Sequence, residues 1–231
     1  IIGLPRSRRL HHLPSYEQGL FFVQDMSSTL VSDMVAAGRP TLVADVCAAP
    51  GGKACGIALS VVSHGGVVHA FDKTATRVSL ISQAVHRLGL GNVVVGRRDA
   101  LVEKKEDHKV FDAVLLDAPC SGFGTVGRKI DVRWSKSEQT IQELVTTQSS
   151  MLARAADLVK PQGVLVYSTC TIDRAENEDV VRDFLASHRE FIQDVLPPCM
   201  SSDLITSEGF YRAWPQRHSM AGAFAALLRR V

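Results

Sequence analysis

Four short apolar runs, each ending in or followed by an aspartate, constrain the fold of this 231-residue chain more than any other feature. The aspartates are Asp45, Asp72, Asp99 and Asp117. Amphipathic stretches separate the runs, and strands that alternate with helices form a parallel sheet with helices on both faces. Such sheets bind their ligands at the carboxyl ends of the strands, so the four acids indicate a binding site there.

The apolar periodicity predicts the individual elements. Helices are expected from about Gln24 to Ala37, from about Asp173 to Ser187, and over Gly52–Val62, Ala75–Leu88 and Ser137–Val159. Seven strands are expected, over Thr41–Val46, Val67–Phe71, Val93–Val95, Phe111–Leu116, Val164–Ser168, Phe191–Leu196 and Ala223–Leu228. Two pairs have the spacing of a capping box, Ser135 with Glu138 and Asp173 with Glu176.

The composition is that of a globular protein, because 45% of the residues are hydrophobic, which is enough for one sizeable core. The net charge of +2 is weaker than that of a dedicated nucleic-acid binder. No apolar run is long enough to cross a membrane. We expect a catalytic domain over residues 21–231 and a basic extension over residues 1–20 that carries Arg6, Arg8 and Arg9. Because the chain starts at Ile1 rather than Met, we expect upstream domains in a longer protein.

The cysteines are widely spaced, at positions 47, 55, 120, 170 and 199, with no CxxC pair. An odd number with these spacings argues against a disulfide framework or a zinc site and favours a reducing compartment. Free thiols can then serve chemistry. Cys55 and Cys199 are interpreted as small buried apolar residues.

The segment after the first predicted strand resembles a nucleotide-binding turn. It reads Cys47, Ala48, Ala49, Pro50, Gly51, Gly52 and Lys53. Its small residues let the backbone approach a ligand, and the following helix offers free N–H groups. Asp72 lies about 20 residues further on, where an acid accepts the ribose hydroxyls, and Asp99 is expected to reach an adenine amino group. Dehydrogenases share this pattern, but their GxGxxG is absent here.

Lys53 stands at the start of the predicted helix, where a cation is unfavourable against the helix dipole. This conflict indicates that Lys53 contacts an anion, such as the carboxylate of a methionine moiety or a phosphate.

Cys120 and Cys170 each follow the end of a predicted strand, in Asp117–Cys120 and Ser168–Cys170. This placement suits methylation of cytosine at carbon 5, which becomes nucleophilic once a thiolate has added to carbon 6. The thiolate needs a lowered pKa, and the helix expected near Asp173 is one source of it. Asp117 is expected to hold the amino group and ring nitrogen of the base.

These segments together resemble the Sun-domain (Fmu-type) family of RNA cytosine-5 methyltransferases. The resemblance is carried, in the family's order, by Phe22–Asp25, Cys47–Lys53, Asp117–Gly122 and Ser168–Thr171. It implies an α/β, Rossmann-like class I S-adenosylmethionine-dependent methyltransferase fold, with a mostly parallel sheet that ends in an antiparallel strand pair.

The resemblance also implies roles for single residues. Cys170 would be the nucleophile, and Cys120 would assist breakdown of the covalent intermediate. The cofactor, S-adenosylmethionine, would be contacted by residues 47–53 and by Asp72, Arg77, Asp99 and Asp117.

The loop after Cys120 carries the residues expected to contact RNA, which needs cationic contacts for its backbone and stacking for an extruded base. They are Arg128, Lys129 and Arg133, followed by Trp134. The target is expected to be a single-stranded or flipped cytosine, because the reacting carbons are inaccessible in a stacked helix. We expect a monomer without a metal ion or a membrane partner.

Two other interpretations stay open. Where the family usually has Asp-Gly-Phe-Phe near the C-terminus, this chain has Ala221 for the Asp and Ala223 for one Phe. This departure motivates a catalytically weak, cofactor-binding factor in RNA assembly. A DNA cytosine methyltransferase would use Cys120 as its nucleophile and carry a later Glu-Asn-Val element, from which the sequence at 176–178, Glu-Asn-Glu, departs.

Overall fold

The computed structural model of the protein describes residues 10–102, 108–134, 136–198 and 200–231. Several positions singled out in the sequence lie outside these described residues, namely Arg6, Arg8, Arg9, Ser135 and Cys199.

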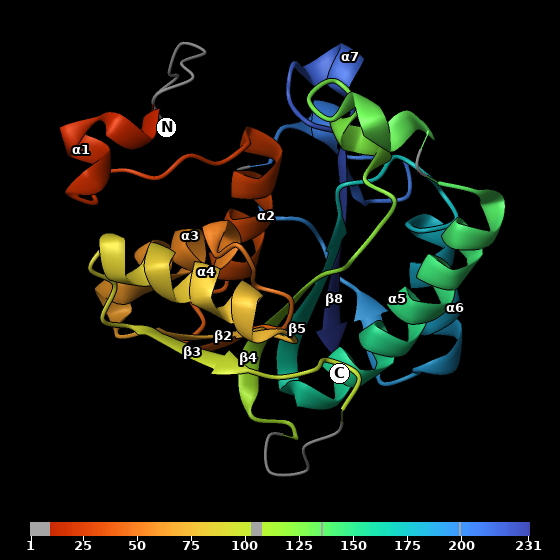
Figure 1. Ribbon diagram of the computed structural model, residues 1–231. Coiled ribbons are helices and arrows are strands. Elements are labelled where there is room, and N and C mark those ends of the chain that lie inside the picture. The colour runs from red at the N-terminus through yellow and green to blue at the C-terminus, as the bar shows by residue number, and fades with distance from the viewer. Residues whose placement is uncertain (1–9, 103–107, 135, 199) are drawn as a thin grey trace.

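An eight-stranded sheet runs through the centre of the molecule (Figure 1). Its strands are β1 (Leu42–Asp45), β2 (Val67–Asp72), β3 (Val93–Arg97), β4 (Phe111–Asp117), β5 (Val159–Thr169), β6 (Phe191–Gln193), β7 (Tyr211–Ala213) and β8 (Ala223–Arg230). They lie in the order β3-β2-β1-β4-β5-β8-β6, and β7 pairs with β8. Strands β1 to β5 are parallel, whereas β8 runs antiparallel to β5, β6 and β7. The predicted fold class is therefore confirmed, including the antiparallel pairing of the last two predicted strands.

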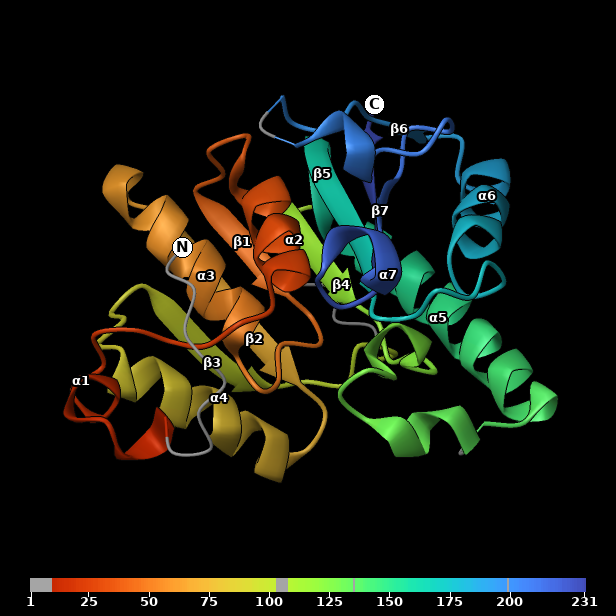
Figure 2. The same ribbon diagram turned by 90° about the horizontal axis from the view of Figure 1, so that it is seen from above.

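Helices cover both faces of this sheet (Figures 1 and 2). On one face lie α2 (Met26–Ala36), α3 (Gly52–Val61) and α4 (Ala75–Arg87), and on the other α5 (Glu138–Leu158) and α6 (Glu178–Ser187). The short helices α1 (Pro14–Glu17) and α7 (Pro215–His218) lie outside these layers, as do the 3-10 turns η1 (Leu10–His12), η2 (Val62–His64), η4 (Phe123–Thr125), η5 (Ile130–Trp134) and η6 (Ser202–Leu204).

The central strands are apolar on both sides because each side faces a layer of helices. In β4, Ala113 and Leu115 pack on the side of α2 and α3, whereas Val114 and Leu116 pack on the side of α5 and α6. All four side chains are fully buried. Their continuous apolar run is what places the following residue, Asp117, at the carboxyl edge of a buried strand.

The structure departs from the sequence predictions at the start of one helix, at the short strands and at β5, which begins at Val159 directly after α5 rather than at Val164. Helix α6 begins at Glu178 rather than near Asp173, because Glu176 turns its side chain into the interior and accepts a hydrogen bond from Ser121 N at 2.8 Å. The predicted capping box of Asp173 and Glu176 is therefore wrong. Helix α5 is capped by Ser137, whose hydroxyl accepts a hydrogen bond from Thr140 N at 3.2 Å.

The extra strand relative to the predicted seven is β7, whose three residues are too few to show an alternating pattern. Within the described ranges, no helix combines the length and apolar character needed to cross a membrane. The same residues contain no group of three or more His, Cys, Asp or Glu side chains placed to hold a metal ion.

Candidate active site

The turn between β1 and α3 brings its backbone close to its surroundings at two glycines. Gly51 caps α3 with a φ of +109°, a conformation that L side chains rarely adopt. A Cβ on Gly52 would lie 3.4 Å from the amide nitrogen of Gln24. Ala48 N donates to Phe71 O at 2.9 Å and ties the turn to β2. The turn therefore leaves the first N–H groups of α3 at the carboxyl edge of the sheet, where they can bind an anion or a polar ligand group.

Two of the predicted carboxylates follow the neighbouring strands. Asp72 ends β2 and is buried, and it accepts hydrogen bonds from Arg77 Nε at 2.8 Å and Ala49 N at 3.2 Å. Arg77 also donates to Ala49 O at 3.3 Å, so it connects Asp72 with the glycine-rich turn. Asp99 follows β3 and forms an ion pair with Lys73 at 2.9 Å. The predicted cofactor residues are thus brought to one edge of the sheet.

Lys53 crosses from the first turn of α3 to the carboxylate that ends β4. Its Nζ lies 2.7 Å from Oδ2 of Asp117, and Ser168 Oγ donates to Oδ1 of the same carboxylate at 2.7 Å. Burial alone lowers the pKa of Lys53, but the charge and hydrogen bond of Asp117 raise it above its ordinary value. Lys53 is therefore a cation, and the anion beside it is the Asp117 carboxylate.

Asp45 lies beneath the glycine-rich turn and is fully buried. Its Oδ1 accepts a hydrogen bond from Cys47 N at 3.3 Å, whereas Oδ2 has no hydrogen-bond partner within the described part of the chain. Burial, followed by the nearby charge of Asp117, raises the pKa of Asp45 to about 7. An acceptor of this kind is suited to an amino group of a ligand.

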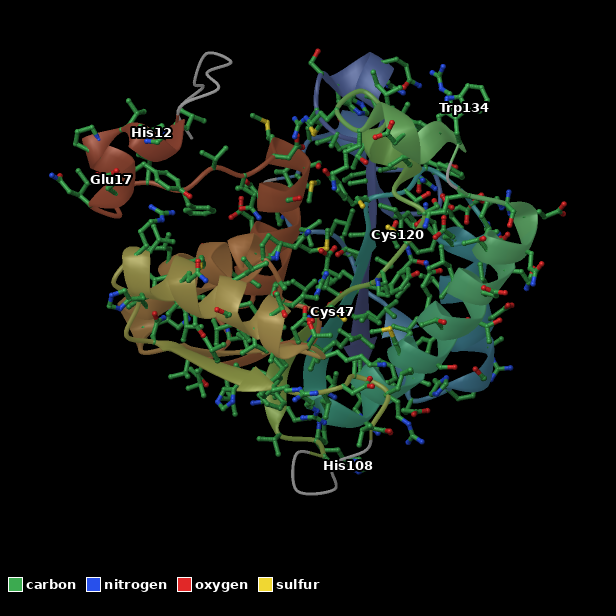
Figure 3. All side chains as sticks on the ribbon, in the orientation of Figure 1. His12, Glu17, Cys47, His108, Cys120 and Trp134 are labelled. Atoms are coloured by element: carbon green, nitrogen blue, oxygen red, sulfur yellow. The ribbon has the colours of Figure 1, made fainter. Side chains whose placement is uncertain are left out.

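The two predicted catalytic cysteines meet above β4 and β5, with their Sγ atoms 3.4 Å apart. Cys120 is half-buried and Cys170 is exposed. The hydrogen bond from Cys120 lowers the pKa of Cys170, and the charges of Lys53 and Lys129 lower it further. The same hydrogen bond, together with burial, raises the pKa of Cys120. The surroundings of the two sulfur atoms therefore favour a thiolate at Cys170 and a thiol at Cys120. Figure 3 shows Cys120 below the loop that ends at Trp134.

The source of the lowered pKa differs from the predicted one. Helix α6 starts eight residues after Cys170, at Glu178, so its N-terminus does not follow the thiolate directly. The groups that lower the pKa are a neighbouring thiol and two lysines from other segments.

A cavity of about 390 Å³ opens beside Cys170. Its lining combines the glycine-rich turn, the ends of β4 and β5, the loop after Cys120 and the start of β8, and it includes Asp25, Pro50, Lys53, Asp117, Thr169, Lys129, Ala221 and Ala223. A ligand in this cavity lies next to the reactive sulfur and the Lys53–Asp117 ion pair together.

The altered C-terminal element still forms regular structure at this cavity. Ala223 begins β8 and pairs with Ala213 of β7. Ala221 N donates to Asp25 Oδ1 at 3.1 Å, and Asp25 also forms an ion pair with Arg128. Both replaced positions line the cavity without interrupting the sheet.

The predicted RNA-contact residues lie along one rim. Arg128 and Lys129 line the cavity beside Cys170. Arg133 lines a neighbouring hollow of about 530 Å³, together with Phe123 and Pro215 among others. Trp134 is 81% exposed and lies at the outer edge of the molecule (Figure 3).

Three buried polar residues behind the cysteines were not predicted as site residues: Gln148, Glu176 and Asn177. Gln148 carries a detectable signal, because it interrupts the apolar stripe that Val145, Leu152 and Ala155 form on α5 at helical spacing. The other two carry none, since a capping-box spacing gives Glu176 an ordinary explanation.

The donor set fits the predicted cofactor, S-adenosylmethionine. The glycine-rich turn provides a close backbone approach, Asp72 and Asp99 place carboxylate oxygens at the same edge of the sheet, and Asp45 holds a buried oxygen without a partner in the described residues.

Comparison with known proteins places these features in context. Residues 36–229 match the family described as 16S rRNA methyltransferase RsmB/F. Ribosomal RNA small subunit methyltransferase F of Serratia proteamaculans is 35% identical over 229 residues, which are 96% of this chain and 47% of that protein. Probable ribosomal RNA small subunit methyltransferase B of Synechocystis is 34% identical over 240 residues, which are 99% of this chain and 53% of that protein.

Among solved structures, NSun6 from Pyrococcus horikoshii with SFG has a TM-score of 0.84 and 28% identity, and the match covers 99% of this chain and 57% of that one. The chain spans about half the length of the curated relatives that it matches.

Proposed function

This chain belongs to the 16S rRNA methyltransferase RsmB/F family, and from that premise we propose that it forms 5-methylcytosine in RNA through a covalent adduct with Cys170. The observation that carries the proposal is the pair of sulfur atoms, 3.4 Å apart, beside a cavity that also contains Asp117 and Lys53. Ribosomal RNA of the small subunit is the substrate class that the relatives' names suggest.

S-adenosylmethionine is the cofactor of this family, and when bound it supplies the electrophilic methyl group that carbon 5 receives. We expect the backbone of residues 47–53 and the carboxylates of Asp72 and Asp99 to hold it. Arg77 positions Asp72 through the bond at 2.8 Å. Asp45 is a further candidate contact, since its buried Oδ2 lacks a partner in the described residues.

In the first step, the Cys170 thiolate adds to carbon 6 of the cytosine. The new S–C bond shifts electron density onto carbon 5, which makes that carbon nucleophilic. Asp117 lines the same cavity, and we expect it to hold the amino group and ring nitrogen of the base. Lys53 holds Asp117 in place through their ion pair at 2.7 Å.

In the second step, the proton on carbon 5 must leave so that the enzyme is released. Once the Cys170 sulfur is bonded to carbon 6, it no longer carries a charge, and the Cys120 thiol can lose its proton to water. The Cys120 thiolate then accepts the carbon-5 proton, and the C–H electron pair forms the C5–C6 double bond. The bond between carbon 6 and sulfur breaks, which returns Cys170 as a thiolate beside a neutral Cys120.

We expect the RNA to lie along the rim that carries Arg128, Lys129 and Arg133, with the target base extruded into the cavity. Lys129 supports this orientation because it lines the cavity and also lowers the pKa of Cys170. The exposed ring of Trp134 offers a stacking surface for a neighbouring base.

The test is turnover of the full-length protein on small-subunit ribosomal RNA with methyl-labelled S-adenosylmethionine. We expect label in the RNA, and nucleoside mass spectrometry should identify it as 5-methylcytidine. Label in another nucleoside would overturn the proposed chemistry. Cofactor binding without any transfer to RNA would instead support the weak assembly factor that the changes at Ala221 and Ala223 motivate.

A further inference from the structure

A buried carboxylate holds the loop of Cys120 from behind. Glu176 is fully buried, and it accepts hydrogen bonds from the backbone N of Ser121 at 2.8 Å and from the Ser121 hydroxyl at 2.5 Å. It also accepts one from Gln148 Nε2 at 2.9 Å. These three donors are neutral, so the carboxylate serves as an acceptor that fixes their positions.

The contact reaches both neighbours of Cys120. Gln148 Nε2 donates to the carbonyl of Pro119 at 2.9 Å as well as to Glu176. Pro119 and Ser121 are therefore both connected to the same carboxylate, one through Gln148 and one directly. The backbone on either side of the thiol is therefore held from behind.

The next residue, Asn177, holds the loop of Cys170 in the same manner. Its Oδ1 accepts a hydrogen bond from Thr169 Oγ1 at 2.6 Å, and its Nδ2 donates to the carbonyl of Thr171 at 3.1 Å. Thr169 and Thr171 are the two neighbours of Cys170. The hydroxyls of Ser121 and Thr171 also share a hydrogen bond at 2.8 Å, which joins the two loops directly.

From this arrangement we propose that Glu176 and Asn177 are positioning residues, a brace that sets the separation of the two catalytic sulfur atoms. The proposal deepens the function proposed above and rests on it for its catalytic meaning. Because the two residues are adjacent in the chain, one backbone segment fixes both thiol loops. The sequence predicts that Glu176 forms a capping box with Asp173, whereas in the structure the side chain of Glu176 bonds Ser121 and that of Asn177 bonds Thr169 in the interior.

We expect different defects when Glu176, which holds the Cys120 loop, and Asn177, which holds the Cys170 loop, are replaced. Glu176→Gln replaces one acceptor oxygen by an amide donor that faces other donors, so it should displace the Cys120 loop and impair release. Asn177→Ala removes both bonds to the Cys170 loop and should impair attack on carbon 6. A residue with a general structural role would instead lower all steps together.

The first readout is the covalent protein–RNA adduct of the full-length protein. In the Cys120→Ala background, where release is blocked, the rate of adduct formation reports the Cys170 arm alone. In that background we expect Asn177→Ala to slow adduct formation by about tenfold, because small misplacements of reacting groups have large effects on rate. We expect Glu176→Gln to change the rate of adduct formation by less than about twofold. With Cys120 present, Glu176→Gln should accumulate adduct that the unmodified protein does not retain.

The matched control is Glu178→Gln. Glu178 lies next to the brace and is also buried, but its carboxylate pairs with Arg212 of β7. We expect this variant to unfold at a lower temperature with its balance of adduct formation and release unchanged. If Glu176→Gln fails to fold, Ser121→Ala removes the hydroxyl arm of the same contact and should accumulate adduct to a smaller extent.

A second readout needs no RNA. Diamide oxidises a pair of nearby thiols to a disulfide and is itself reduced, so the rate of Cys120–Cys170 crosslinking, followed by peptide mapping, reports how well the sulfurs are held together. We expect both brace variants to slow crosslinking several-fold and Glu178→Gln to leave it unchanged. Crosslinking at the unmodified rate in both brace variants would overturn the brace. Slowed crosslinking in a protein whose Cys120→Ala variant never forms an adduct would support the brace and overturn the proposed chemistry.

Discussion

Cys120 and Cys170 occupy equivalent places in the fold, each just beyond the carboxyl end of one of two neighbouring parallel strands, yet their surroundings differ. Cys170 is exposed and lies within reach of the charges of Lys53 and Lys129, which lower its pKa after the hydrogen bond from Cys120. Cys120 is half-buried and its pKa is raised. Topology therefore explains why the two thiols meet. The hydrogen bond between them, the burial of Cys120 and the lysine charges beside Cys170 explain why Cys170 is favoured as the thiolate.

The buried residues that hold the loops of the two cysteines also differ. A carboxylate, Glu176, holds the Cys120 loop, and a neutral amide, Asn177, holds the Cys170 loop. The two loops are thus held by different groups, an acceptor-only carboxylate and an amide that both accepts and donates hydrogen bonds.

Removal of each thiol in turn tests the difference between Cys120 and Cys170 most directly. Cys170→Ala should lower turnover by at least about a thousandfold and abolish covalent adducts, because no other thiol replaces the nucleophile. Cys120→Ala should also stop turnover but leave a protein–RNA adduct that denaturing gels retain. Gel retention of labelled RNA measures both outcomes.

A serine at either position serves as the control for packing, since it keeps the volume and removes the sulfur. The assignment of roles is reversed if the adduct forms in Cys170→Ala and not in Cys120→Ala. Thermal unfolding midpoints close to that of the unmodified protein exclude misfolding as the cause.

A smaller effect is expected when the charge next to Cys170 is removed. Lys53 lowers the pKa of Cys170, so Lys53→Met should raise it and reduce the thiolate fraction at neutral pH. Alkylation of Cys170 by iodoacetamide follows the thiolate fraction below the pKa, and its pH profile should move to higher pH, with a several-fold lower rate at pH 7. Peptide mass spectrometry separates this reaction from alkylation of Cys120.

Lys73→Met provides the matched control, because Lys73 forms an ion pair with Asp99 on another part of the same edge. The pH profile of Cys170 alkylation in this variant should coincide with that of the unmodified protein. Equal shifts in both variants would mean that overall charge, rather than the position of Lys53, sets the reactivity of Cys170.

Much of the fold followed from local patterns, and the exceptions share one cause. The runs that end at Asp45 and Asp117 are buried strands, because continuous apolar runs of that length require cover on both faces. The run that ends at Asp72 is also a strand, in which buried and half-buried residues alternate. The predicted helix at Asp173 was wrong at its start because the preference of Glu176 for a capping position is weaker than its contacts with Ser121 and Gln148. Contacts between residues 28 and 55 positions apart leave no local trace in a sequence.

In the site, too, some features were predictable from local sequence and others depend on contacts between distant residues. Parallel topology brings Cys120 and Cys170 together as their strand-end positions predict, and Lys53 was recognised by its conflict with the helix dipole. The partner of Lys53 was not predictable, because Asp117 follows a strand that is distant in the chain. Gln148 is the intermediate case, since a polar residue in an apolar helix stripe indicates a buried contact without indicating its partner.

The smallest effect is expected at Arg128 and Lys129, on the rim where we propose that RNA binds. Replacing these residues tests whether the cations near Cys170 also bind the substrate. Arg128 and Lys129 both line the cavity, but Arg128 already forms an ion pair with Asp25. Lys129→Ala should therefore weaken RNA binding by about threefold at physiological salt and reduce the slope of log affinity against log salt by about 0.7, the value for one phosphate of a single strand. Arg128→Ala should have a smaller effect on both quantities. Filter binding over a range of salt concentrations measures them.

Arg189→Ala is the control for charge alone, because this exposed arginine follows α6 and lies between α6 and β6, away from the cavity lining. It should leave affinity and slope unchanged within error. An effect of Arg189→Ala equal to that of Lys129→Ala would mean that RNA is attracted by net charge and not by this rim. In that case Lys129 acts only on the thiolate, and the two functions assigned to the surroundings of Cys170 would have to be separated.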